Sequence, residues 1–301
     1  MRPIAEAYKD FPILHKEHNG HRVIYLDSGA TAQIPQSVID SVVEHMTQRN
    51  GNPHRGSHIL AIEASEDYEN ARDRVVEFIN AREREEVVFT RNSTESMNLI
   101  AHSYGLHNVK KGDKIVITVA EHHANLVTWQ YVAEQTGATL EYMYLDEHGH
   151  LKDGEINKID ESTKIVAFAH VSNVLGMEFP VKELTEKAHS VGAIVVLDGA
   201  QSTPHKKIDV QALDCDFFVF SGHKMCASQG IGVLYGKREL LEAMPPFLLG
   251  GDMIEYVKEQ TATFNELPYK FEAGTPNADG AVSLHAAIDY LESFGMDAIE
   301  A

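Results

Sequence analysis

Apolar residues gather in seven short runs along the chain, and several of these runs are continuous in Val, Ile and Phe. Continuous apolar runs of this length are typical of strands that are buried on both faces. The runs cover residues 85–90, 113–119, 139–145, 164–171, 193–198, 216–221 and 232–236. Because such strands favour parallel pairing beneath two layers of helices, the pattern predicts an α/β fold with a mostly parallel seven-stranded sheet.

Segments with the 3.6-residue period of an amphipathic helix lie between these runs. One face of the helix expected at residues 65–81 carries Tyr68, Ala71, Val75 and Ile79. Residues 181–192 repeat the pattern and end at Gly192, as a helix C-cap does. Residues 280–301 predict a long helix that the chain leaves soon after Gly295. We expect either further chain or a partner to cover the apolar face of this helix.

Composition and charge exclude several classes of function. The chain has 301 residues, of which 43% are hydrophobic and 24% charged, and its formal net charge is −19. This acidic balance disfavours nucleic acid or an anionic membrane as the main partner. No apolar run approaches the roughly 20 residues of a membrane span, and no secretory signal is present. Cys215 and Cys226 form no CxxC pair, so we expect a cytoplasmic protein with reduced thiols and no metal.

Polar residues follow the predicted strands, where an open α/β sheet binds its ligands. Ser93 and Thr94 lie at a strand-to-helix turn that could serve as a plain helix cap or as a phosphate site. Other strand ends carry His122 and His123, His170 and Asn173, Asp198 and Gln201, and Lys224. A single histidine at such a place is often a satisfied structural residue, so spacing alone does not assign these side chains.

Lys224 and Asp198 together suit an aldehyde cofactor that carries a ring nitrogen and a phosphate. A partly buried lysine can remain neutral and form a Schiff base with the aldehyde. A carboxylate can keep the ring nitrogen protonated, so that the ring withdraws electrons from the substrate. A histidine can stack on the ring, and a strand-to-helix turn can bind the phosphate.

Seven segments in a fixed order carry a family resemblance: "HRGSH", "NSTE", "EHHANLVTWQ", "HVSNVLG", "DGAQ", "DVQALDCDFFVFSGHK" and "FEAGTPN". Together they resemble the Suf-type (type II) cysteine desulfurases and selenocysteine lyases, which are pyridoxal 5'-phosphate enzymes of the class V aminotransferase group. The resemblance implies a fold-type I large domain at residues 21–277, after an N-terminal segment at 1–20. Residues 278–301 would begin a linker helix to a C-terminal small domain. A homodimer with shared active sites is also implied.

The resemblance also implies a role for each candidate residue. Lys224 would hold the cofactor aldehyde, Asp198 would pair with the pyridine nitrogen, and Gln201 would bond the phenolic oxygen. His122 would stack on the ring and shuttle protons. The implied phosphate ligands are Ser93, Thr94, Ser221 and His223, together with Thr275 from a second subunit. The implied substrate contacts are Asn173, near the carboxylate, and His54 and Arg55, near the site entrance.

The implied reaction converts L-cysteine to L-alanine and passes the sulfur, as an enzyme-bound persulfide, to an acceptor protein of iron–sulfur assembly. L-selenocysteine is the alternative substrate. The family's persulfide cysteine and its carboxylate-binding arginine are expected beyond Ala301, so we expect this chain to release little sulfide. We expect Cys215 to be buried, and Cys226 to be either a small space-filling residue or a reactive thiol. Another class V enzyme, such as an aminotransferase or epimerase, and a non-catalytic cofactor-binding fragment remain open alternatives.

Overall fold

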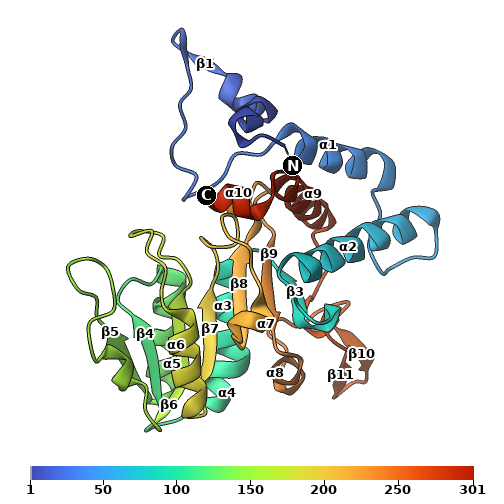
Figure 1. Cartoon of the computed structure of the whole chain (residues 1–301). Coiled ribbons are helices and arrows are strands. Elements are labelled where there is room, and N and C mark those ends of the chain that lie inside the picture. The colour runs from blue at the N-terminus through green and yellow to red at the C-terminus, as the bar shows by residue number, and fades with distance from the viewer. Residues whose placement is uncertain (1) are drawn as a thin grey trace.

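The computed structural model describes residues 2–301, and its centre is a sheet with helices on both faces (Figure 1). Within these residues the sheet has seven strands, in the order β3-β9-β8-β7-β6-β4-β5. Their bounds are β3 Val87–Thr90, β4 Lys114–Thr118, β5 Thr139–Met143, β6 Thr163–Ala169, β7 Ile194–Asp198, β8 Phe217–Ser221 and β9 Gly232–Gly236. Neighbours from β8 to β5 run parallel, whereas β9 pairs antiparallel with both β8 and β3. Each of the seven apolar runs forms a strand of this sheet, and the prediction of a mostly parallel sheet is confirmed.

Alternate side chains of each strand enter two separate hydrophobic cores. Val116 and Phe218 belong to one core, and their strand neighbours Ile117 and Phe217 belong to the other. The helices of the first core are α2 (Ile59–Phe78), α6 (Val181–Ser190) and α9 (Ala278–Phe294). The helices of the second core are α3 (Ser93–Ile100), α5 (Val127–Thr136) and α8 (Arg238–Ala243). Because strand side chains alternate between faces, a continuous apolar run supplies both cores at once.

Shorter elements surround the sheet. The remaining helices are α1 (Gln36–Glu44), α4 (Leu106–Asn108), α7 (Val210–Leu213) and α10 (Met296–Glu300). Two small hairpins pair β1 (Glu17–His18) with β2 (His21–Arg22), and β10 (Ile254–Val257) with β11 (Ala262–Phe264). The sequence did not predict these hairpins, because their residues are largely exposed and lack apolar alternation. In residues 2–301 no helix combines the length and apolar character needed to cross a membrane.

The C-terminal helix is broken at Gly295, whose φ of 88° ends α9 before α10 begins. Within the chain, α9 packs against α1 and α2 (Figure 1). The side chains of Ala281, Leu284 and Ile288 on α9 are accordingly fully buried.

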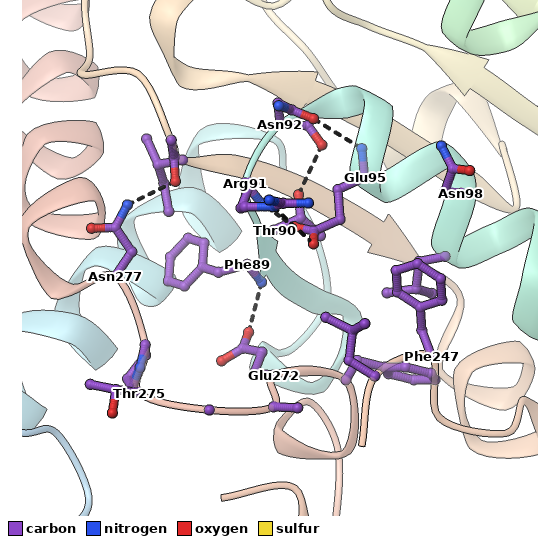
Figure 2. A pocket seen from close by; sticks show the side chains of 18 of the residues that line it. Phe89, Thr90, Arg91, Asn92, Glu95, Asn98, Phe247, Glu272, Thr275 and Asn277 are labelled. Atoms are coloured by element: carbon purple, nitrogen blue, oxygen red, sulfur yellow. Dashed lines mark hydrogen bonds and ion pairs between the residues drawn. The ribbon is translucent and has the colours of Figure 1, made fainter. Parts of the chain in front are cut away.

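A buried ion pair ties α2 to the loop that precedes α9. The guanidinium of Arg72 is fully buried and donates to both carboxylate oxygens of Glu272, at 2.7 and 2.9 Å. Glu272 also accepts from the backbone N–H of Phe89 at 2.7 Å, shown in Figure 2, and from the hydroxyl of Tyr68 at 2.9 Å. These contacts satisfy both charged groups, so removing Arg72 would leave the carboxylate of Glu272 buried without a charged partner.

We expect Arg72→Ala to lower the free energy of unfolding by about 3–5 kcal/mol, because it leaves the buried carboxylate of Glu272 without its charged partner. Arg74→Ala is a matched control on the same helix. Its guanidinium pairs at the surface with Asp289 and Glu292, and its loss should cost no more than about 1 kcal/mol. Urea unfolding of the two variants measures the difference, and equal losses would contradict this account of Arg72.

Candidate active site

A cavity of about 420 Å³ lies where the carboxyl ends of β6, β7 and β8 meet the N-terminus of α3. Its lining includes the sequence-predicted residues Ser93, Thr94, His122, Asn173, Asp198, Gln201, Ser221, His223 and Lys224. Parallel strands bring their carboxyl ends to one edge of the sheet, and this geometry joins residues that are far apart in the sequence. The structure therefore gathers the candidate amine, carboxylate, imidazole and hydroxyl groups into one cavity.

Lys224 lies in a tight turn directly after the buried strand β8. The turn requires Gly222, because a Cβ there would come within 2.7 Å of the Ile231 side chain. Burial lowers the pKa of the Lys224 amine from its usual value, and the nearby charge of Asp198 opposes that change. A lowered pKa increases the neutral fraction of the amine, which is the form that attacks a carbonyl.

Asp198 ends β7 inside the cavity and is only 6% exposed. Its Oδ1 accepts a hydrogen bond of 2.9 Å from the backbone N–H of Ala200. Burial raises the pKa of this carboxyl, although the Ala200 N–H and the charges of Lys224 and His122 act against the change. The next position requires glycine, because a Cβ at Gly199 would lie 2.0 Å from the ring of Phe218.

His122 lies in the turn after β4 and lines the same cavity. Its Nδ1 accepts the backbone N–H of Ala124 at 3.1 Å. This bond places any proton of the neutral ring on Nε2. Burial lowers the pKa of His122, and the charge of Lys224 adds to that effect while Asp198 opposes it.

The N-terminus of α3 forms the end of the cavity that suits an anion. Asn92 caps this helix, since its side chain accepts the backbone N–H of Glu95 at 3.0 Å. The expectation that Ser93 or Thr94 is the cap is therefore wrong. Instead the Ser93 hydroxyl meets the Ser221 hydroxyl at 2.6 Å, and Ser221 Oγ also accepts the Ser93 backbone N–H. Hydroxyls at a helix N-terminus, where the helix dipole is positive, favour a bound phosphate.

The sequence reasoning missed one segment of the cavity wall, residues 27–33. Gly29 and Ala30 of this segment line the cavity. The side-chain amide of Gln201 donates to the carbonyl of Gly29 at 2.8 Å, so one of its two N–H groups is already engaged. The segment has no strand or helix periodicity, and its only sequence signal is a group of small residues in "DSGATA".

Three predicted site residues lie outside this cavity. Thr275 lines a second cavity of about 900 Å³, which shares Asn92 and Thr94 with the first (Figure 2). His54 makes a contact of 3.2 Å from Nε2 to Glu69, and Arg55 pairs with Asp252. Neither His54 nor Arg55 lines either cavity. The implied role of His54 and Arg55 near the site entrance stays a prediction from the sequence.

Neither cysteine lines the cavity of the candidate site, and the cavity beside Cys226 shares Lys224 with it. Cys215 is fully buried, which confirms the expectation from its position at a strand entry. Cys226 lines a separate, mainly apolar cavity of about 300 Å³. Burial raises the pKa of its thiol to about 12, so the thiol remains protonated at neutral pH. This environment favours the space-filling interpretation of Cys226 over a reactive thiol.

Glu121 is a buried acid beside His122 that the sequence reasoning did not use. Its carboxyl group accepts the side-chain amide of Asn125 at 2.6 Å and contacts the hydroxyl of Thr118. Asn125 in turn accepts the indole N–H of Trp129 at 2.8 Å. This buried chain of hydrogen bonds holds the turn that carries His122. Burial raises the pKa of Glu121 to about 8, and the charge of Asp198 contributes to the change.

Comparison with known proteins gives a consistent result. The family model described as aminotransferase class-V matches residues 24–301. A probable cysteine desulfurase of Halalkalibacterium halodurans is 53% identical over 98% of this chain and 73% of its own length. A cysteine desulfurase of Haloferax volcanii is 49% identical, over 97% of this chain and 72% of its own.

Solved structures agree with these relatives. The crystal structure of the Escherichia coli cysteine desulfurase CsdA is 40% identical, with a TM-score of 0.89 over 99% of this chain and 74% of its own. The apo structure of a cysteine desulfurase from Thermococcus onnurineus is 41% identical, with a TM-score of 0.92 over 99% of this chain and 72% of its own. These likenesses confirm the predicted fold-type I architecture.

We expect Glu121→Gln to change the pH dependence of stability. The pKa of Glu121 in the folded chain, about 8, lies above the unfolded value of about 4.3. The stability contribution of its protonated form is therefore complete below the unfolded pKa and is lost as pH rises to about 8. The free energy of unfolding of Glu121→Gln should therefore increase, relative to that of the unsubstituted chain, as the pH rises from 5 to 8. Urea unfolding at both pH values measures the gain, with exposed Glu161→Gln as control. If the difference in free energy of unfolding between Glu121→Gln and the unsubstituted chain does not change with pH, the raised pKa of Glu121 is refuted.

Proposed function

We infer the function from one premise: this chain belongs to the class V aminotransferase family, among its cysteine desulfurases. We propose that it binds pyridoxal 5'-phosphate and L-cysteine for a reaction in which a cysteine thiol other than Cys215 and Cys226 takes the substrate sulfur as a persulfide, the C–S bond breaks and L-alanine is left. The main support is that Lys224, Asp198 and the N-terminus of α3 line one cavity. The names of relatives at about half identity favour this reaction over that of an aminotransferase or an epimerase.

The groups in the cavity fit the chemistry of pyridoxal 5'-phosphate. An amine with a lowered pKa suits the aldehyde, and a buried carboxylate suits the ring nitrogen. The hydroxyls of Ser93 and Ser221 at the start of α3 suit the phosphate. When bound, the cofactor supplies a ring that withdraws electrons from the substrate carbon.

The residues of this chain then have distinct tasks. Lys224 would hold the cofactor through its amine, and Asp198 would keep a proton on the ring nitrogen. His122 would pack on the ring and would move protons at Nε2, because its Nδ1 is engaged by the Ala124 N–H. Gln201 has a second amide N–H, besides the one on Gly29, for the phenolic oxygen. The amide of Asn173 would bind the substrate carboxylate.

The proposal extends to partners. We propose a homodimer, in which Thr275 of each subunit approaches the phosphate of the other. The cavity that Thr275 lines adjoins Asn92 and Thr94 of the site, which supports an approach from that side. Val43, Met46 and Ile59 are exposed apolar residues, at 52%, 51% and 64%, as at many subunit interfaces. L-selenocysteine as a substrate, a sulfur acceptor of iron–sulfur assembly and a cytoplasmic location remain predictions from the sequence.

We expect the purified chain to gain visible absorbance when pyridoxal 5'-phosphate is added, because the cofactor binds covalently to the Lys224 amine. Lys224→Ala should abolish this absorbance. Lys182→Ala, at a side chain that is 89% exposed, should leave it unchanged. A chain that stays colourless with the cofactor would refute the proposed cofactor.

With an added thiol as the sulfur acceptor, we expect His122→Ala to slow alanine release from L-cysteine by about 100-fold or more, because it removes the group that moves protons. Cys226→Ser should not change the rate, since the Cys226 thiol lies in a different cavity and stays protonated. Both variants should keep the visible absorbance of the bound cofactor. Loss of alanine release in Cys226→Ser would show instead that this thiol handles sulfur.

A further inference from the structure

Residues 27–33, which we call the strap, are hydrogen-bonded to the turn that carries Lys224. The carbonyl oxygen of His223 accepts the backbone N–H of Ala32 at 2.8 Å and the hydroxyl of Thr31 at 3.1 Å. The hydroxyl of Tyr25, just before the strap, donates to the carbonyl of Thr31 at 2.7 Å. The strap is thus held from both sides at Thr31, next to His223.

The Thr31 hydroxyl makes a second contact, 3.2 Å to Nδ1 of the His223 ring. A hydroxyl has one proton, and a carbonyl oxygen can only accept. If the Thr31 proton is donated to the His223 carbonyl, the ring contact requires a proton on Nδ1. The Nδ1–H tautomer of His223 is the one that makes both contacts hydrogen bonds, whereas the Nε2–H tautomer would take the Thr31 proton at Nδ1 and leave the His223 carbonyl with the Ala32 N–H alone.

We propose that Thr31 is a positioning residue, which accepts the Nδ1–H of His223 so that the ring can take up a second proton at Nε2 and donate it to a phosphate in the cavity. The proposal rests on the proposed function, because it concerns the phosphate group of the same cofactor. His223 lines the cavity together with Ser93, Thr94 and Ser221, whose hydroxyl groups lie at the end of the cavity near the N-terminus of α3.

The tautomer has a consequence for anion binding. A neutral ring with its proton on Nδ1 presents a lone pair at Nε2, and it donates there only after taking up a second proton. Burial and the charge of Lys224 lower the pKa of His223, which opposes that proton. The other titratable groups of the cavity are His122 and Asp198, and Asp27 lies on the strap. A phosphate dianion beside the ring would favour the second proton and form a charge-assisted hydrogen bond.

Thr31→Val and Thr31→Ser separate the hydroxyl from the shape of the side chain. Valine keeps the branched shape of threonine but cannot bond the carbonyl or the ring of His223. Serine keeps the hydroxyl. The full chain is titrated with pyridoxal 5'-phosphate and, as the matched ligand without a phosphate, with pyridoxal. Visible absorbance reports the binding of both compounds.

In Thr31→Val, the affinity for pyridoxal 5'-phosphate should fall by about tenfold or more, as expected for a lost hydrogen bond to a charged group. The affinity for pyridoxal should not change, and Thr31→Ser should bind both compounds as the unsubstituted chain does. Equal weakening of both compounds in Thr31→Val would indicate a general structural role and overturn the proposal. Unchanged affinity for pyridoxal 5'-phosphate, or no rescue by serine, would also overturn it.

Nitrogen NMR of the chain labelled at histidine tests the tautomer without any cofactor. His223→Gln identifies the His223 signals, which should show a protonated Nδ1 in the unsubstituted chain and lose that pattern in Thr31→Val. A ring protonated only at Nε2 would refute the proposal. If neither compound produces absorbance in the unsubstituted chain, the cofactor proposal fails, and the NMR result still decides the role of Thr31.

Discussion

The strands of the central sheet are covered on both faces, so a charged side chain within them would lose its hydration without gaining a partner. In β6, β7 and β8 the charged side chains are therefore restricted to the strand ends, and these parallel strands bring their carboxyl ends together. Asp198 and Lys224 lie at two of these ends. Burial shifts the pKa of each group away from its ordinary value, and this shift prepares them for the proposed chemistry.

Two kinds of buried charge occur in this protein, and their contacts distinguish them. Arg72 and Glu272 satisfy each other with paired hydrogen bonds and hold α2, β3 and a loop together. Asp198 has a single backbone N–H on one oxygen and faces a cavity shared with Lys224. A satisfied pair stabilises the native packing, whereas a carboxylate with spare hydrogen-bonding capacity is suited to a ligand.

Sequence patterns identified the strands, the lysine and the carboxylate because each has a local signal. A buried strand requires a run of apolar residues, and the polar residues that follow the run mark its end. The family segments then associated these ends with a cofactor. No local pattern reveals the strap, since its small residues make no periodic element and its contacts to His223 join positions far apart in the chain. The helix cap was misassigned for a related reason, because Asn92, Ser93 and Thr94 are all good cap residues.

The sequence by itself determined the sheet, the two helical layers and the placement of Lys224 and Asp198 after buried strands, because apolar periodicity controls which segments can be buried. Only the tertiary structure decided which groups share the cavity. It placed Thr275, His54 and Arg55 outside that cavity, put Cys226 in a different one, and covered α9 with α1 and α2. These outcomes depend on contacts between distant segments, and such contacts are set by packing and hydrogen bonding in three dimensions rather than by any local run of residues.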